Sequence, residues 1–251
     1  GGQERDTRQN RNRMRPEIVS NHAVSTGRIA ESMERAEQYG KDKPVDSLEF
    51  QLKRTRLKVL GGKDPRTLVE EFTSLADRPA AGPEVRYGLA LAYWRNGSLD
   101  KAATTLAALL KSDPDRILYR TTLARIELEA GQIDQALTRF RSTLELYPGD
   151  IVVSQHYAAA LLRAGRAVEA RDKAREMLRD EAARTPEVYE LWARASKVSG
   201  PPWESNQASA ELYYRSGNVK LAIDQLEQAL QHKEMSQYDQ ARIQARLTAF
   251  R

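Results

Sequence analysis

The sequence predicts an all-α protein whose helices form hairpins stacked side by side in an α-solenoid, and three observations support this. Ala, Leu, Arg and Glu, which favour helix, dominate almost every segment. Gly97, Gly131 and Gly165 recur at an interval of 34 residues. Hydrophobic residues make up 40% of the chain and charged residues 30%, which is typical of a folded, well-solvated chain.

Other residue types recur at the same interval, and each suits a helical hairpin. Small side chains let two helix axes approach closely, a glycine ends the first helix because it adopts positive φ without steric cost, and a proline opens the linker to the next hairpin. An interval of 34 residues is that of the tetratricopeptide (TPR) repeat. The recurring sets are Ala90, Ala124 and Ala158; Ala102, Ala136 and Ala170; and Pro114 and Pro148.

The predicted elements follow from this pattern. Regular repeats cover about 83–116, 117–150 and 151–185, with helix pairs at 83–96 and 99–112, 116–130 and 133–146, and 150–164 and 167–181. Upstream, we expect a helix at 28–39, a linker at 40–45 and a degenerate hairpin at 46–60 and 65–77. Asp64 and Pro65 provide a cap and a first-turn proline for the last of these helices.

After residue 185 the repeat becomes irregular, and the region 186–251 contains an irregular repeat and a cap. Gly165 and Gly217 are 52 residues apart, which is one repeat plus 18 residues, so we expect one inserted helix at 186–198. A further hairpin follows, with Ala210, Gly217 and Ala222 in the relative places of the repeat. Residues 236–250 are predicted to form a C-terminal capping helix over the apolar end of the stack.

Several classes of function are disfavoured by the composition. The chain has no cysteine, and no HExxH, Walker or GxSxG motif occurs in it, so it carries no complete known active site. No run of about 18 apolar residues is present that could span a membrane. The net charge is +5, but acidic and basic residues alternate along the helices. The cluster of Arg5, Arg8, Arg11, Arg13 and Arg15 lacks interleaved aromatic residues, so we predict no nucleic-acid partner.

The candidate binding site is the groove lined by the first helices of the repeats. Aromatic anchors with polar and cationic neighbours suit a protein or peptide partner. For the leucines in this set, the alternative role is packing between hairpins. The predicted groove residues are Tyr87, Leu91 and Trp94 in the first repeat, Arg125 and Leu128 in the second, and Gln155 and Arg163 in the third.

Four segments, in this order along the chain, resemble a known family. They are PEIVSNHAVSTGRIAESMERAEQY, EFQLKRTRLKVL, YGLALAYWRNGSLDKA and SQYDQARIQARLTAF. The chain resembles periplasmic HExxH zinc metallopeptidases that carry C-terminal TPR repeats. The resemblance implies that residues 1–40 are the tail of the peptidase domain, partly disordered with one helix, and that 41–251 form a TPR superhelical domain. It also implies a periplasmic location.

The same resemblance implies a division of labour. This chain would not be an enzyme and would need no cofactor, whereas the parent protein would be a zinc metalloendopeptidase. His22 matches a histidine that lies close to the zinc in this family, and Arg28 matches the arginine that follows it; Ala23 replaces the usual proline. Unchanged zinc affinity and proteolysis in a full-length His22→Ala variant would exclude that role.

Two functions are therefore carried forward. The resemblance favours a module that binds a misfolded substrate or the outer-membrane assembly machinery on behalf of the peptidase. The alternative is a free-standing TPR adaptor or assembly protein without peptidase activity.

Overall fold

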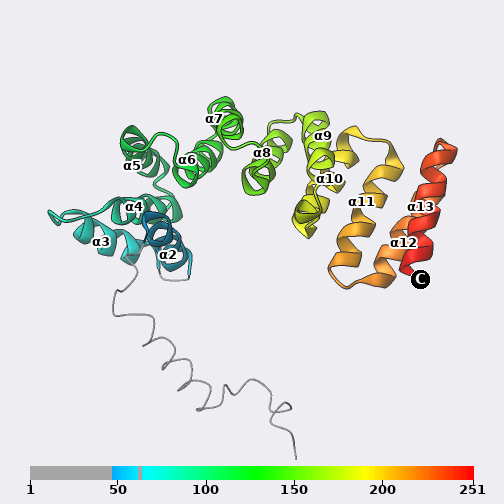
Figure 1. The fold of residues 1–251 in the computed structure, drawn as a ribbon, viewed down its shortest axis with the longest axis horizontal. Helices are drawn as coiled ribbons and strands as arrows, with labels where there is room; N and C mark the ends of the chain where they lie inside the picture. The colour runs from blue at the N-terminus through cyan, green and yellow to red at the C-terminus, as the bar shows by residue number, and fades with distance from the viewer. Residues whose placement is uncertain (1–46, 62–63) are drawn as a thin grey trace, which may run out of the picture. The chain divides into compact units, whose positions relative to one another are not determined.

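The computed structural model describes residues 47–61 and 64–251, and Ser47–Arg251 form one compact unit. The predictions for His22, Arg28, the N-terminal arginines, the segment 1–40, its helix 28–39 and the linker 40–45 lie outside the described residues. The described residues form helices and no strand (Figure 1). The helices are α2 (Leu48–Leu60), α3 (Pro65–Ala76), α4 (Pro83–Arg95), α5 (Leu99–Ser112), α6 (Ile117–Glu129), α7 (Ile133–Leu146), α8 (Ile151–Arg163), α9 (Ala167–Met177), α10 (Pro186–Ser199), α11 (Pro202–Arg215), α12 (Val219–Leu230) and α13 (Gln237–Phe250).

The helix boundaries confirm the predicted all-α hairpins α4–α5, α6–α7, α8–α9 and α11–α12. The largest difference concerns α9, which was predicted to reach residue 181 and instead ends at Met177. The side chain of Asp180 accepts a hydrogen bond from the backbone nitrogen of Ala182 at 3.0 Å and begins a short 3-10 helix, Glu181–Ala183. Aspartate favours such a start because its carboxylate accepts hydrogen bonds from nearby backbone N–H groups.

A glycine with positive φ closes the turn inside each hairpin. Gly97 has φ of 74° and Gly217 has φ of 81°. After each glycine the backbone reaches back over the turn: Ser98 N donates to Tyr93 O at 2.9 Å, and Asn218 N donates to Tyr213 O at 2.8 Å. This is the Schellman ending of a helix. An added Cβ at either glycine meets nothing within 4 Å, so the turn requires glycine for its backbone conformation and not for space.

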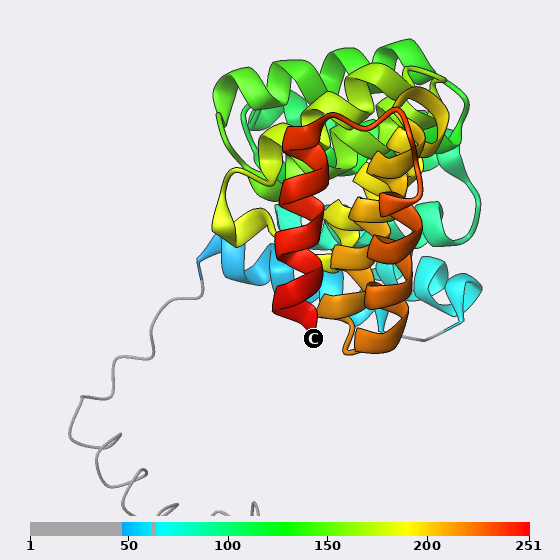
Figure 2. The ribbon, with the colours of Figure 1, turned by 90° about the vertical axis from the view of Figure 1, so that its right-hand side faces the viewer.

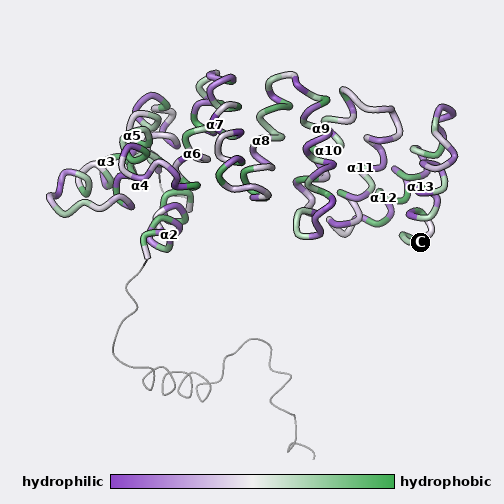
Figure 3. The backbone as a smooth tube through the Cα atoms, turned by 45° about the horizontal axis from the view of Figure 1, so that its top comes forward, coloured by the Kyte–Doolittle hydropathy of each residue, from purple (hydrophilic) through white to green (hydrophobic). Residues whose placement is uncertain are grey.

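Small residues lie where the helices cross, as predicted. Hydrophobic and hydrophilic positions alternate along the helices (Figure 3), so each helix has one face to bury. Gly88 adds a close crossing that the repeat pattern did not show, because a Cβ there would lie 2.1 Å from Cε1 of Phe72 on α3. The predicted crossing alanines, all buried, are Ala90, Ala102, Ala124, Ala136, Ala158, Ala170, Ala210 and Ala222.

From α4 onward the helices form two layers, because each helix packs mainly against its predecessor and its successor. The first layer holds α4, α6 and α8, and α10 continues it through contacts with α8. The second layer holds α5, α7 and α9, and α11 continues it: Arg175 Nε on α9 lies 3.6 Å from Glu204 Oε1 on α11. Figure 2 looks along the stack from the end at which α13 lies.

The inserted helix α10 therefore exchanges the two layers. Ala210, Gly217 and Ala222 give α11 the features of the first helix of a repeat, yet α11 lies in the layer of the second helices. Insertion of an odd number of helices into an alternating stack has this result. The stack ends with α13, which packs on α12 and buries Ile243 and Leu247, so the predicted C-terminal capping helix is confirmed.

At the other end, α2 and α3 both pack on α4. Leu52 and Val59 of α2 are fully buried there, as is Leu68 of α3. An ion pair of 2.5 Å between Lys58 Nζ and Glu71 Oε1 joins α2 to α3. The position of α2 matters for function, because α2 covers a face of the first layer.

Candidate functional site

The structure corrects the predicted groove at α4, because α2 lies on it. Tyr87 and Leu91 are fully buried, and the hydroxyl of Tyr87 accepts a hydrogen bond from Arg56 Nη1 of α2 at 3.1 Å. The prediction that Tyr87 and Leu91 line an open groove is therefore wrong. The sequence pattern placed them on the correct side of α4, but it did not show that a helix from outside the regular repeats covers that side.

The remaining predicted groove residues have different surroundings. Trp94 is held between neighbours: its Nε1 donates to Glu129 Oε2 at 2.7 Å, and the Arg125 guanidinium lies 4.6 Å from its ring centroid. Leu128 packs against the core that includes Ala124 and Phe140, so it has the alternative role of packing between hairpins. Gln155 and Arg163 lie on α8, half-buried and exposed respectively.

Of the predicted set, Arg125 lines a cavity on the first layer, which we call the groove cavity. It has a volume of about 320 Å³ and lies between α2, α6 and α8. Arg56 of α2 and His156 of α8 share its wall. Burial, followed by the charges of Arg125 and Arg56, lowers the pKa of His156 from 6.5 to about 4. The imidazole is therefore neutral near pH 7, while both guanidinium groups stay charged.

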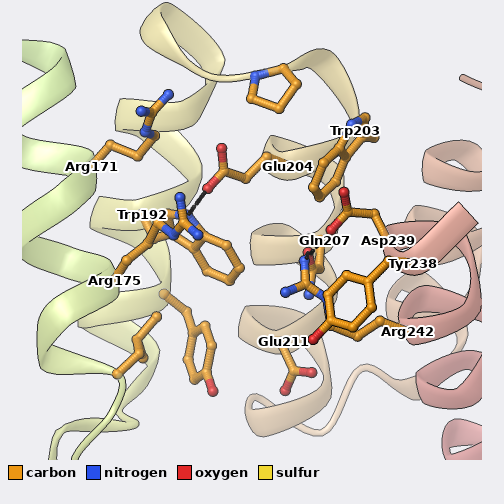
Figure 4. Close-up of a pocket in the computed structure, with 13 residues that line it drawn as sticks. Arg171, Arg175, Trp192, Trp203, Glu204, Gln207, Glu211, Tyr238, Asp239 and Arg242 are labelled. Carbon is orange, nitrogen blue, oxygen red and sulfur yellow. Dashed lines mark hydrogen bonds and ion pairs between the residues drawn. The ribbon is translucent and has the colours of Figure 1, made fainter. Parts of the chain in front are cut away.

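A second cavity, which the sequence analysis missed, lies on the second layer between α9, α11 and α13, with α10 behind it (Figure 4). We call it the α9–α13 cavity; its volume is about 520 Å³. Aromatic rings and arginines dominate its lining. Tyr238 is 75% exposed at its rim. The lining residues that matter below are Arg175, Trp192, Trp203, Glu204, Tyr238 and Arg242.

Hydrogen bonds fix the acidic groups of the α9–α13 cavity. Trp192 Nε1 donates to Glu204 Oε1 at 2.8 Å, as Figure 4 shows, and Glu204 is almost fully buried. Glu211 forms a two-point ion pair with Arg246, at 2.5 and 2.8 Å. Arg175 is half exposed and meets Glu204 only at 3.6 Å, so it retains donors for a ligand. The cavity thus offers aromatic surface and cationic donors.

A weak signal in the sequence could have found this cavity. Where the first helices of two consecutive repeats are neighbours, the side chains that bridge them are 35 positions apart in the sequence. In the regular repeats Trp94 bonds Glu129, and after the insertion Arg242 Nη2 donates to Gln207 Oε1 at 3.0 Å. The spacing between Gln207 and Arg242 indicates that α11 and α13 are neighbours. The 18-residue insertion then indicates that their shared face belongs to the other layer.

Two further properties concern metal and membrane. In the described part of the chain no group of three or more His, Asp or Glu side chains is placed to hold a metal ion. The zinc that the resemblance implies belongs to the peptidase part of the parent protein, and His22, the residue expected near it, lies outside the described residues. Among the same residues, no helix is long and apolar enough to cross a membrane.

Comparison with known proteins identifies the family to which the chain belongs. A tetratricopeptide repeat model matches residues 70–126 and 127–195, just over half of the chain. The chain therefore belongs to the tetratricopeptide repeat family. A solved structure of a MamA mutant shares this fold, with a TM-score of 0.51 and 20% identity over 67% of this chain and 92% of that one.

The curated relatives of the chain indicate a more specific kind of protein. The chain is 23% identical over 238 residues to the beta-barrel assembly-enhancing protease of Yersinia pestis, a match that covers 94% of the chain and 49% of the relative. It is 25% identical over 244 residues to the Escherichia coli protease of the same name, covering 94% and 48%. The chain thus spans about half the length of the curated relatives it matches. These matches confirm the resemblance to this kind of protease.

Proposed function

We propose that this chain is the protein-binding module of a periplasmic zinc metallopeptidase of the beta-barrel assembly-enhancing type, and that its α9–α13 cavity holds a segment of the partner polypeptide. The cavity is the observation that carries the proposal. Two tryptophans and two tyrosines line it together with three arginines. Aromatic and arginine side chains provide most of the binding energy in protein interfaces.

The partner that suits this surface is an unfolded or extended segment with apolar side chains. Trp203 and Tyr238 offer rings for such side chains, and Arg175 and Arg242 can bond the carbonyl oxygens of its backbone. A substrate of the peptidase and a component of the outer-membrane assembly machinery both supply such segments. Proteolysis and its zinc belong, in this proposal, to parts of the full-length protein other than the described residues, and His22 with Arg28 would lie near that zinc.

Site-specific crosslinking in the full-length protein tests the proposal. A photoreactive phenylalanine analogue replaces Tyr238 in one variant and Thr104, exposed on α5, in the control. We expect crosslinks to an outer-membrane β-barrel protein or its assembly machinery from position 238 and at least 10-fold fewer from position 104. Equal yields from both positions, or none from position 238, would contradict the proposal. Tyr238 is a suitable site because its exposure leaves folding unaffected by the change.

A further inference from the structure

Two of the three carboxylates that line the α9–α13 cavity are fully used within the chain. In Asp239, Oδ2 accepts a hydrogen bond from Ser236 Oγ at 2.6 Å, and Oδ1 lies 3.2 Å from Arg242 Nη2. Glu211 uses both of its oxygens in the ion pair with Arg246. Each oxygen of these two carboxylates therefore has a partner within the chain.

Glu204, the third carboxylate, has one oxygen without such a partner. Its side chain is only 5% exposed. Oε1 accepts the Trp192 indole N–H at 2.8 Å, and Arg175 Nε lies 3.6 Å from the same oxygen. Oε2 accepts no hydrogen bond from the residues that the structure describes. Because a buried carboxylate is stable only when its remaining lone pairs are also satisfied, Oε2 indicates a place for a donor from outside the chain.

Gly200 keeps the space beside this oxygen free. A Cβ at position 200 would lie 2.7 Å from Glu204 Oε2 and 3.0 Å from Ser196 O. The backbone at Gly200 has φ of −102°, which any residue can adopt, so a side chain here would be opposed by lack of space and not by backbone strain. The glycine therefore allows Oε2 to remain uncovered on that side.

The aromatic lining of the cavity determines which kind of donor fits. Glu204 lies between Trp192 and Trp203 in Figure 4, and Tyr189 and Tyr238 also contribute to the wall. Aromatic rings pack favourably on another ring in offset or edge-on arrangements. The volume of about 520 Å³ accommodates a tyrosine side chain with part of its neighbours in the chain. A phenol supplies both a ring and an O–H that can donate to Oε2.

The charges of the cavity favour a neutral donor over a cationic one. Its lining contains three arginines and three carboxylates, so the local charge is balanced; they are Arg171, Arg175 and Arg242, and Glu204, Glu211 and Asp239. A lysine or arginine of a partner would lose its hydration without entering a negative environment. It would also meet the positive charge of Arg175 beside Glu204. A tyrosine hydroxyl is neutral near pH 7 and avoids both costs.

We infer that the α9–α13 cavity recognises a tyrosine side chain in the segment that it binds. The phenol O–H donates to Glu204 Oε2, and the ring lies among Trp192, Trp203 and Tyr238. This inference rests on the proposed function, because it takes the ligand of the cavity to be a polypeptide. It adds a side-chain preference: among extended apolar segments of similar size, those with a tyrosine at the buried position bind more tightly.

Four peptides that differ at one position test the inference with the whole 251-residue chain. The probe is acetyl-Ser-Val-Leu-X-Val-Ser-Gly amide, in which X is tyrosine, phenylalanine, 4-methoxyphenylalanine or lysine. Binding is followed by NMR through the indole N–H resonance of Trp192, which reports on the cavity itself. We expect the tyrosine peptide to bind about 10-fold more tightly than each of the others, because only its side chain donates to the carboxylate without carrying a charge.

The 4-methoxyphenylalanine peptide separates the donated hydrogen bond from ring packing, since it keeps the ring and the oxygen but has no O–H. Affinity equal to that of the tyrosine peptide, for this peptide or for the phenylalanine peptide, would overturn the inference. A lysine peptide that binds as tightly as the tyrosine peptide would overturn it as well. Binding without a tyrosine preference contradicts this inference alone, whereas no shift of the Trp192 resonance with any peptide contradicts the proposed function too.

A pair of matched variants assigns the preference to Glu204. Glu204→Gln keeps the size of the side chain but removes the charged acceptor, so the tyrosine preference should fall to about 2-fold or less. Glu190→Gln removes the same charge from an exposed residue of α10 outside the cavity and should keep the full preference. An equal loss in the two variants would reduce the effect to net charge and refute the site.

Gly200→Ala provides a second variant that retains the carboxylate and its charge. The added Cβ displaces Glu204 Oε2 and should also remove the tyrosine preference. The urea midpoint of unfolding shows whether each variant is folded before the peptides are compared. A folded Gly200→Ala chain that keeps the full preference would refute the position assigned to the phenol, and the comparison of peptides on the wild type depends on neither variant.

Discussion

Side-chain pairs with the same spacing join neighbouring helices before and after the inserted helix α10, but the two sets of pairs lie on opposite layers. Side chains 35 residues apart join α4 to α6, and side chains with the same spacing join α11 to α13. Yet α4, α6 and α8 form the first layer, whereas α11 and α13 lie in the second. One helix, α10, makes this difference without interrupting the stack. The length of an insertion, counted in helices, therefore decides which face a repeat presents.

The largest expected effect is a loss of folding stability in the regular repeats that precede α10. Phe140→Ala removes a fully buried ring that packs against His156 and Tyr157, and should destabilise the chain by about 3–5 kcal/mol. Phe250→Ala, at the last helix, should cost less because solvent adjoins it and the end of the stack can relax. Urea unfolding of both variants measures the difference. An equal loss would contradict the expectation that the end of the stack relaxes around the removed ring.

A pH effect of intermediate size should be confined to the groove half. Because the pKa of His156 is lowered from 6.5 to about 4 in the folded chain, the unfolded chain takes up a proton first as the pH falls. The stability contributed by the neutral imidazole is present above pH 6.5 and is lost between 6.5 and 4, by at most about 3 kcal/mol. No histidine lines the α9–α13 cavity.

Comparison of the wild type with His156→Gln at pH 7 and pH 4.5 measures this effect by urea unfolding. The variant should lose less stability on acidification than the wild type, since glutamine takes up no proton. An identical loss in both proteins would contradict the assignment. General acid unfolding does not confuse the result, because it cancels in the difference between the two proteins.

The smallest expected effect is a loss of stability at the hairpin turns, and it should be equal before and after α10. Gly131→Ala and Gly217→Ala each place a Cβ on a residue with φ near 80°, where an L side chain costs about 1–2 kcal/mol. Neither Cβ meets an atom within 4 Å, so backbone strain is the sole expected cost. Thermal unfolding should show similar shifts for both. A much larger shift at one glycine would indicate that the turn there makes contacts beyond its hairpin.

The fold was predictable from the sequence because its determinants are local and repeated. Gly97, Gly131 and Gly165 fix the turns, and the buried alanines fix the crossings, whatever the rest of the chain does. The site was harder to predict because it depends on distant segments. Tyr87 and Leu91 were placed on the correct side of α4, but both are buried there, and Arg56 of α2, 31 residues earlier in the chain, bonds the Tyr87 hydroxyl. Of the predicted groove residues, Arg125 was found in the wall of the groove cavity.

The α9–α13 cavity could not be predicted by extending the repeat. Once α10 exchanges the layers, the periodic pattern places α11 and α13 on the wrong face. Glu204 and Trp192 illustrate a second reason: their hydrogen bond joins the inserted helix to the next hairpin, and no repeat template contains such a pair. Spacings between specific side chains, such as Gln207 and Arg242, carry the information that periodicity lacks.

The exchange of layers also separates the groove cavity from the α9–α13 cavity. The groove cavity and the α9–α13 cavity belong to different layers, so a ligand in one leaves the other accessible. A single polypeptide long enough to reach both cavities would be held at two points. Once the first part is bound, the second binds at an effective concentration set by the length of the connecting segment, commonly in the millimolar range for short flexible connections. Two weak sites of this kind would retain a long unfolded chain and release short fragments readily.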